Sequence, residues 1–182
     1  MPAPEDGVTA LGAAAHLIRD VADYPKPGIL FKDITPLLAD ADGLARTVAA
    51  LAGGVGEAGG VDLVVGIEAR GFILAAPVAT ALGAGFVPVR KAGKLPWRTL
   101  SATYALEYGE AEIEVHEDAV RPGQRVLVVD DVLATGGTAA AAIDLLERLG
   151  AVVVELVVLI ELAELGGRER LAGRSVRSLL QV

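Results

Sequence analysis

The fold class of this 182-residue chain follows from the segment 126–138. Four apolar residues at 126–129 are followed by Asp130 and Asp131, and small residues with two glycines then lead into a helical pattern at 137–149. A short apolar run of this kind is typical of a strand buried on both faces, and a strand that leads into a helix is the unit of α/β proteins. Because open α/β sheets bind ligands at the carboxyl ends of their strands, the acids and the glycine turn are expected at a ligand-binding edge.

The remaining segments predict a single domain, residues 1–182, with an α/β fold. Buried strands are expected at the apolar runs 61–67, 86–89, 125–129 and 152–160. Helices are expected at 10–21, 42–51, 72–82 and 137–149. Two prolines and a glycine predict an irregular segment at 24–28, and alternating apolar and polar residues predict an antiparallel hairpin of 101–108 and 111–116. Strands that alternate with helices give a central, mainly parallel sheet flanked by helices.

Composition excludes several classes of protein. With no cysteine and two histidines, the chain has no disulfide, no thiolate nucleophile and no Cys- or His-rich metal site. A net charge of −8 and 4% aromatic residues argue against nucleic-acid binding, which needs a cationic face or stacking platforms. The most apolar stretch, 151–160, contains Glu155 and is too short to span a membrane, and the acidic start MPAPEDG is unlike an export signal. We therefore expect a cytoplasmic globular protein without nucleic-acid or membrane partners.

The turn after the two acids has the composition of a phosphate-binding site. Small residues before a helix can direct several backbone N–H groups, and the helix N-terminus, toward one anion. This phosphate cradle consists of Ala134, Thr135, Gly136, Gly137 and Thr138. Asp130 and Asp131 would repel phosphate, but as ionised acceptors they suit two neighbouring hydroxyls of a ribose. The pattern favours a ribose 5-phosphate as ligand; the alternative is a structural turn whose acids bind nothing.

A basic segment at 90–100 contrasts with the acidic chain around it. It has no periodicity, and its charged and turn-forming residues are Arg90, Lys91, Gly93, Lys94, Pro96 and Arg98. A solvated surface loop would explain this composition. A mobile lid that closes over an anionic ligand would explain it equally well, and would also exclude water from the site.

The segment 126–138 resembles the phosphoribosyl-pyrophosphate signature of the type I phosphoribosyltransferases, which displace pyrophosphate from the ribose C1 with a nitrogen base. Four other segments, 24–38, 66–72, 90–96 and 103–109, resemble parts of the adenine-specific members of this family. They correspond to the base-binding segment, the pyrophosphate loop, and the start and end of the catalytic lid. The resemblance implies the type I fold, with a flexible lid hairpin at about 90–109 and a small N-terminal hood. It also implies transfer of phosphoribosyl to adenine, giving AMP and pyrophosphate in purine salvage.

The same resemblance assigns roles to single residues. It implies that Glu107 is the catalytic acid or base for a ring nitrogen of adenine. Adenine would be read by the backbone of Leu30 and Lys32 and stacked between Phe31 and Val132. The pyrophosphate-binding residues would be Glu68, Ala69, Arg70, Lys91, Lys94 and Tyr108.

Two further expectations concern partners of the chain. The resemblance implies that Arg90 reaches the site of a neighbouring subunit, and therefore that the protein is a homodimer. Mg²⁺ is the expected cofactor, held mainly by oxygens of the substrate without a direct protein ligand.

Two alternatives remain open from the sequence. The first is a phosphoribosyltransferase for another base, such as hypoxanthine, xanthine or orotate, against which the segment 24–38 and Glu107 argue. The second is a non-catalytic phosphoribosyl-binding regulator that acts on nucleic acid. Such a regulator needs a basic face and no lid, whereas this chain has a net charge of −8 and a lid sequence.

Overall fold

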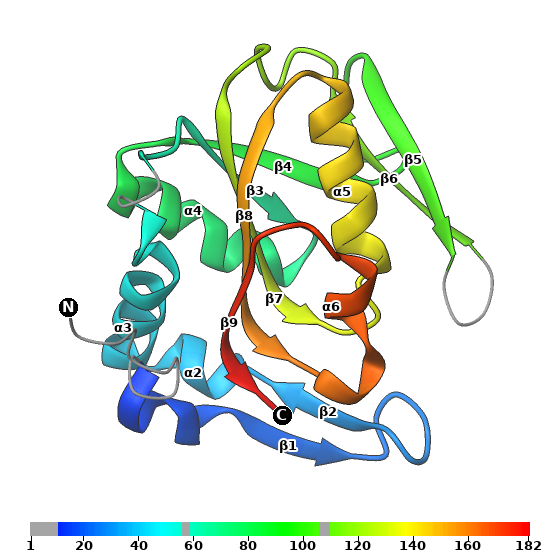
Figure 1. The fold of residues 1–182 in the computed structure, drawn as a ribbon. Coiled ribbons are helices and arrows are strands. Elements are labelled where there is room, and N and C mark those ends of the chain that lie inside the picture. Colours follow the sequence, from blue (N-terminus) through cyan, green and yellow to red (C-terminus); the bar gives the residue numbers. More distant parts are fainter. Residues whose placement is uncertain (1–10, 56–58, 106–109) are drawn as a thin grey trace.

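The computed structural model describes residues 11–55, 59–105 and 110–182 (Figure 1). In this part of the chain a seven-stranded sheet has the order β5-β6-β4-β3-β7-β8-β9. Its strands are β3 (Leu63–Ile67), β4 (Gly85–Lys91), β5 (Thr99–Ala105), β6 (Glu110–His116), β7 (Arg125–Leu133), β8 (Val152–Glu161) and β9 (Val176–Gln181). Neighbours from β4 to β9 pair in parallel, and β5 and β6 add an antiparallel hairpin. The expected mainly parallel sheet and the hairpin are confirmed.

Helices cover both faces of the sheet, as expected for an α/β fold (Figure 1). On one face lie α4 (Arg70–Leu82) and α3 (Ala41–Ala52), and on the other lies α5 (Gly137–Arg148). Alternate residues of β7 divide between the two cores: Val126 and Val128 pack on the α5 side, Leu127 and Val129 on the α4 side. Burial of such a side chain contributes roughly 1.5–3 kcal/mol, so this strand is well anchored. No helix of the described residues is long and apolar enough to cross a membrane.

The strand β7 is longer than predicted. It pairs with β8 as far as Leu133, so both acids lie within it instead of after its end. Its pairing with β3 stops at Val129, because the chain of β3 turns into α4 just beyond. From Asp130 onward one edge of β7 is therefore free of a neighbouring strand, which opens a crevice at the carboxyl edge of the sheet.

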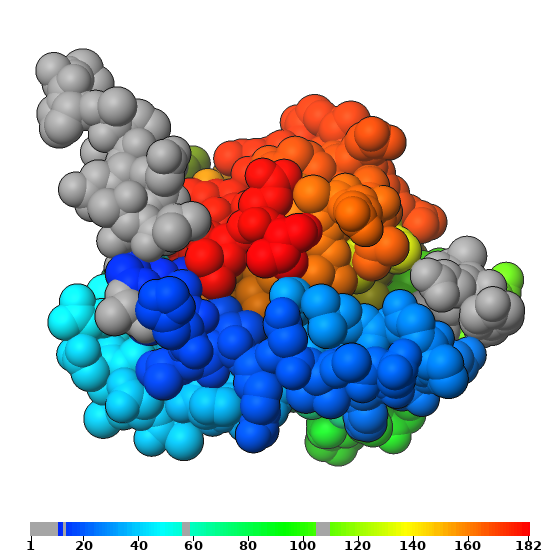
Figure 2. Space-filling view, turned by 90° about the horizontal axis from the view of Figure 1, so that it is seen from below, coloured from blue at the N-terminus to red at the C-terminus, as the bar shows by residue number. Residues whose placement is uncertain are grey.

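The N-terminal hood differs most from the prediction. The expected helix 10–21 is wrong: a 3₁₀ helix, η1 (Gly12–Leu17), is followed by β1 (Arg19–Ala22). This strand pairs antiparallel with β2 (Leu30–Asp33), which leads into α2 (Thr35–Ala39). Two cross-strand ion pairs stabilise the pairing, Arg19 with Asp33 at 2.5 Å and Lys32 with Asp20 at 2.8 Å. Viewed from below, the hood crosses the end of the molecule beside the C-terminal strand (Figure 2).

The basic segment is more ordered in secondary structure than expected. β4 extends to Lys91, and β5 begins at Thr99, so the turn between them covers residues 92–98. After β8 the chain forms η3 (Ala163–Leu165) and α6 (Gly167–Arg170), two short elements that the sequence did not indicate. They lie beside the start of α5, which places them behind the phosphate cradle (Figure 1).

Candidate active site

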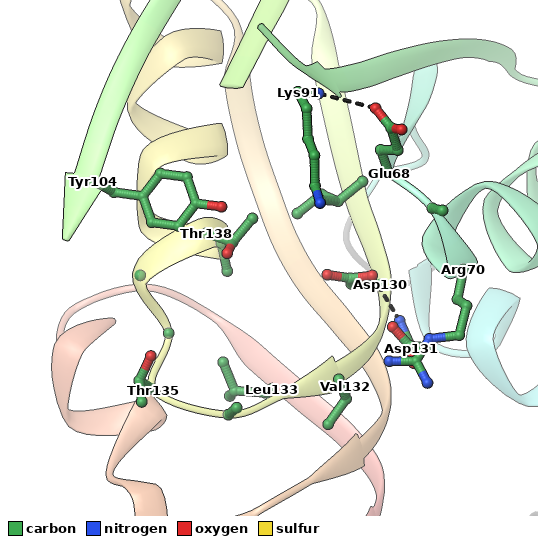
Figure 3. Close-up of a pocket in the computed structure, with 16 residues that line it drawn as sticks. Glu68, Arg70, Lys91, Tyr104, Asp130, Asp131, Val132, Leu133, Thr135 and Thr138 are labelled. Atoms are coloured by element: carbon green, nitrogen blue, oxygen red, sulfur yellow. Dashed lines mark hydrogen bonds and ion pairs between the residues drawn. The ribbon is translucent and has the colours of Figure 1, made fainter. Parts of the chain in front are cut away.

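A cavity of about 270 Å³ lies at the crevice beside β7 (Figure 3). It collects residues from segments far apart in the sequence: the loop after β3, the end of β4, the end of β7 and the start of α5. The predicted site residues that line it are Glu68, Ala69, Arg70, Lys91, Asp130, Asp131, Val132, Ala134, Thr135, Gly136, Gly137 and Thr138. The candidate ribose, phosphate and pyrophosphate residues thus share one site.

The phosphate cradle is made mainly of backbone. Gly136 has a φ of 76°, a left-handed conformation that favours glycine, and α5 begins at the next residue. In the described part of the chain no side chain caps α5, so its first N–H groups face the cavity without an internal partner. Together with the positive end of the helix dipole, they form a site for a phosphate.

A segment behind the cradle, at Gly166 and Gly167, was missed from the sequence. A Cβ at Gly167 would lie 2.1 Å from the carbonyl oxygen of Ala134, and a Cβ at Gly136 would lie 2.7 Å from that of Gly167. The two backbones therefore touch, and α6 supports the cradle from behind. The glycine itself was the signal in the sequence, but it follows the cradle by some thirty residues and carries no local pattern.

The two acids at the floor of the cavity have different surroundings. Asp131 is 5% exposed, and its Oδ2 lies 2.8 Å from Nε of Arg70. Asp130 accepts a hydrogen bond of 2.9 Å from the backbone N–H of Asp131. Burial, followed by the charge of Asp131, raises the pKa of Asp130 well above its usual value. Burial also raises the pKa of Asp131, although Arg70 opposes this rise. The pair is therefore costly to ionise while no hydroxyl donates to it.

The opposite wall of the cavity is a cluster of charges around Glu68. This carboxylate accepts a 2.9 Å hydrogen bond from the backbone N–H of Lys91 and forms an ion pair with the side chain of Lys94. Nε of Arg90 lies 3.5 Å from its Oε2. Desolvation would raise the pKa of Glu68, but hydrogen bonds from Lys94 and Lys91 outweigh it and hold that pKa below its usual value. Lys91 extends its side chain into the cavity, whereas Lys94 is turned to Glu68 (Figure 3).

The adenine-binding candidates lie beside the cavity. Leu30, Phe31 and Lys32 form β2 of the hood, and Val132 lines the cavity itself. The guanidinium carbon of Arg70 lies 5.0 Å from the centre of the Phe31 ring, so Arg70 connects the hood with Asp131. This contact joins the hood to the floor of the cavity beside Asp131.

Two candidates, Glu107 and Tyr108, lie outside the described residues. Tyr104 of β5 lines the cavity and was not singled out from the sequence. Its hydroxyl points into the cavity, which Thr138 also lines (Figure 3). Its position in β5 brings it there because this strand packs against α5.

The chain resembles proteins of known family along almost its whole length. The phosphoribosyl transferase domain family matches residues 38–176. An adenine phosphoribosyltransferase of Acidothermus cellulolyticus is 67% identical over 93% of this chain and 94% of its own length. One from Nocardioides is 60% identical over 100% of this chain and 99% of its own.

Solved structures give the same result for the fold. The adenine phosphoribosyltransferase of Rhodothermus marinus matches with a TM-score of 0.90 and 53% identity, covering 96% of this chain and 99% of that one. The enzyme from Saccharomyces cerevisiae, solved with an imino-altritol bisphosphate and adenine, has a TM-score of 0.91 and 38% identity, covering 95% and 99%. With a domain match over more than half of its residues and relatives this similar, the chain belongs to the adenine phosphoribosyltransferase family of type I phosphoribosyltransferases.

Proposed function

We propose that this chain transfers the 5-phosphoribosyl group of phosphoribosyl pyrophosphate to adenine, giving AMP and pyrophosphate in purine salvage. One observation carries the proposal: a single cavity joins a phosphate cradle, two acids and a cationic wall, in a chain 67% identical to an adenine phosphoribosyltransferase. The yeast relative binds adenine and an imino-sugar bisphosphate, which have the size and charge that this cavity suits. The reaction breaks the bond from C1 to the pyrophosphate oxygen, which leaves with its electron pair, and forms a bond from C1 to a ring nitrogen.

The cavity residues divide this substrate into three parts. The cradle at 134–138 would bind the 5-phosphate through its N–H groups and hydroxyls. Hydroxyls of the ribose would donate to Asp130 and Asp131, which offsets the cost of ionising two buried acids. Lys91, with the loop residues 68–70, would hold the pyrophosphate and neutralise the charge that it gains as it leaves.

The base and the proton belong to the hood and the lid. Phe31 and Val132 would stack on adenine, while backbone groups of Leu30 and Lys32 would read its edge. A fixed amide or carbonyl distinguishes the donating amine of adenine from the accepting oxygen of a 6-oxo purine. Glu107 would take up the ring proton as the new bond forms, with Tyr108 beside it on the lid.

Mg²⁺ would arrive with the substrate. This ion prefers oxygen ligands, keeps several waters and is commonly bound through phosphates with one or two carboxylates. Oxygens of the pyrophosphate and the ribose would supply its ligands, and the negative charge of Asp130 and Asp131 at the cavity floor would favour the ion beside them. The ion would screen the charge of the leaving group.

A homodimer is proposed from the surface of α4. Residues 71–82 of this helix carry no charge. Ile73 is 47% exposed, and Phe86 of β4, whose ring contacts that of Phe72, is 38% exposed. A helix that is apolar on all sides is normally covered, and a second copy of the chain is the partner that would also bring Arg90 to a neighbouring site. We expect Ile73→Asp to convert a dimer into a monomer in analytical ultracentrifugation. A wild-type monomer would contradict this assembly.

One assay tests the function. The purified protein is mixed with phosphoribosyl pyrophosphate and Mg²⁺, each base is offered singly, and pyrophosphate and nucleotide are measured. Formation of AMP with adenine alone is the expected result. Turnover with a 6-oxo purine or orotate would overturn the base assignment and leave the reaction class. Binding of phosphoribosyl pyrophosphate without turnover on any base would favour the regulator. We place the activity in the cytoplasm, which fits a chain without cysteine.

A further inference from the structure

Glu114 of β6 is a buried acid in a strand whose other acids are exposed. Glu114 is only 6% exposed. Its neighbours Ile113 and Val115 point into the hydrophobic core, so the side chain of Glu114 lies on the opposite face of the strand. Six acids fall within residues 107–118, a density typical of a solvated face, yet Glu114 is buried. The reason is tertiary: the turn 92–98 folds over β6 and covers this one carboxylate.

The carboxylate of Glu114 is saturated with hydrogen bonds from that turn. Its Oε1 accepts from the backbone N–H groups of Lys94 and Leu95, both at 2.9 Å. Its Oε2 accepts from the hydroxyl of Thr99 at 3.2 Å, and the backbone N–H of Gly93 also donates to the carboxylate. Burial would raise the pKa of Glu114, but these donors hold it below its usual value, so the group is ionised at neutral pH. One side chain therefore fixes three consecutive amides of the turn.

The fixed turn carries Lys94, which reaches the cavity wall through its ion pair with Glu68. The carbonyl oxygen of Lys94 accepts a 2.9 Å hydrogen bond from Nη1 of Arg90. Lys91, whose N–H donates to Glu68, directly precedes the turn. A chain of contacts thus runs from Glu114 through the amides of 93–95 to Lys94, Arg90 and the wall of the cavity.

We propose that Glu114 is a positioning residue for pyrophosphate: it holds the turn so that Lys94 stands at the Glu68 edge of the cavity. The proposal rests on the proposed function, in which this edge binds the pyrophosphate end of the substrate. Within the described residues, the side chain of Glu114 accepts hydrogen bonds from the turn and from Thr99, and none from the cradle or the hood. We therefore expect its effect on one substrate and not on the other.

The test separates the Michaelis constants of the two substrates. We expect Glu114→Ala to raise KM for phosphoribosyl pyrophosphate about 10- to 100-fold, the range for losing hydrogen bonds to a charged group. KM for adenine should stay within about threefold of the wild-type value, because the variant weakens the binding of phosphoribosyl pyrophosphate alone. Glu114→Gln keeps an acceptor oxygen for the turn, so its KM for phosphoribosyl pyrophosphate should lie between the values of wild type and Glu114→Ala. Direct binding of pyrophosphate, measured by calorimetry, weakens in the same order.

The matched control is Glu112→Ala. Glu112 is two residues earlier on the same strand, is exposed, and accepts from the hydroxyl of Ser101 at 2.6 Å. It should leave both Michaelis constants at their wild-type values. A double variant, Glu114→Ala with Lys94→Ala, should be little worse than the poorer of the two single variants, because both act on one element.

Three results would overturn the proposal. The first is wild-type KM for phosphoribosyl pyrophosphate in Glu114→Ala, the second is an equal rise for adenine, and the third is full additivity with Lys94→Ala. If Glu114→Ala does not fold, the same comparison of KM for phosphoribosyl pyrophosphate with KM for adenine is made in Glu114→Gln and Thr99→Val. Failure of the proposed function gives a different result, because the wild type would then make no AMP. The pyrophosphate affinities of wild type, Glu114→Gln and Glu114→Ala, measured by calorimetry, would still support or contradict the role of Glu114.

Discussion

The two sides of the cavity are built by different means. The cradle side consists of backbone: the turn 134–138 is tied to a buried strand and a helix, and Gly167 presses against it from behind. Behind that contact, the buried Glu161 holds Arg168 through Nε at 2.9 Å and accepts from Ser178 at 2.7 Å. The lid side consists of charged side chains on a turn, held by Glu68 and Glu114. One side is fixed by packing, and the other by hydrogen bonds near solvent.

This difference indicates how the two sides act on the substrate. A backbone cradle is ready before the 5-phosphate arrives and loses little entropy on binding it. On the lid side Lys94 is ion-paired with Glu68, so pyrophosphate must compete with a carboxylate for this cation. The cradle side is therefore expected to set the register of the substrate, and the lid side to add affinity for its pyrophosphate end and to act during the reaction.

The largest expected effect is on the lid side. If Glu107 moves the ring proton of adenine, Glu107→Ala lowers kcat by about 10²- to 10⁴-fold, the usual range for a general acid or base. Binding of phosphoribosyl pyrophosphate, measured by calorimetry, should change little, because the cradle is intact. The control is Glu110→Ala, which removes an exposed acid at the start of β6. Unchanged kcat in Glu107→Ala would contradict its catalytic role and the expectation that the lid side acts during the reaction.

The cradle side can be broken from behind by Gly167→Ala. The new Cβ would lie 2.1 Å from the carbonyl oxygen of Ala134, which is backbone and cannot rotate away. Overpacking of this kind costs about 1–3 kcal/mol, so we expect affinity for phosphoribosyl pyrophosphate to fall about 10- to 100-fold, with a lower melting temperature. Glu164→Ala, exposed in the same segment, should bind normally. Wild-type affinity in Gly167→Ala would show that the cradle does not need this support.

At the floor between the two sides, Asp130→Asn should stabilise the free protein by about 1 kcal/mol and weaken phosphoribosyl binding about tenfold. Burial, then Asp131, raises the pKa of Asp130, so its protonated form is favoured by folding. The stability that protonated Asp130 contributes is fully present below the usual pKa of 3.8, and it is lost as pH rises through the raised pKa of the folded state. Wild type should therefore lose stability over that range relative to Asp130→Asn, in thermal melts without ligand. A less stable variant at pH 7 would contradict this.

Local patterns predicted the cradle side well and the lid side in part. The strand at 126–129 and the helix at 137–149 follow from hydrophobic runs and glycine punctuation, which act over a few residues. The helix expected at 10–21 was wrong because pairing with β2, a contact between separated segments, overrode the helical pattern. Burial of Glu114 depends on a turn that folds back over it, so its sequence neighbours could not distinguish it.

The smallest expected effect tests where the two sides meet. Tyr104 comes from the lid hairpin, yet it lines the same cavity as Thr138 of the cradle, with its hydroxyl pointing inward (Figure 3). Tyr104→Phe keeps the ring and removes the hydroxyl, so one hydrogen bond to the ligand is lost, and KM for phosphoribosyl pyrophosphate should rise about three- to tenfold. Tyr24→Phe, exposed on the hood, is the control. If Tyr104 closes over the 5-phosphate, affinity for ribose 5-phosphate alone falls by the same factor. If that affinity is unchanged while the KM rises, Tyr104 acts with the lid on the pyrophosphate instead.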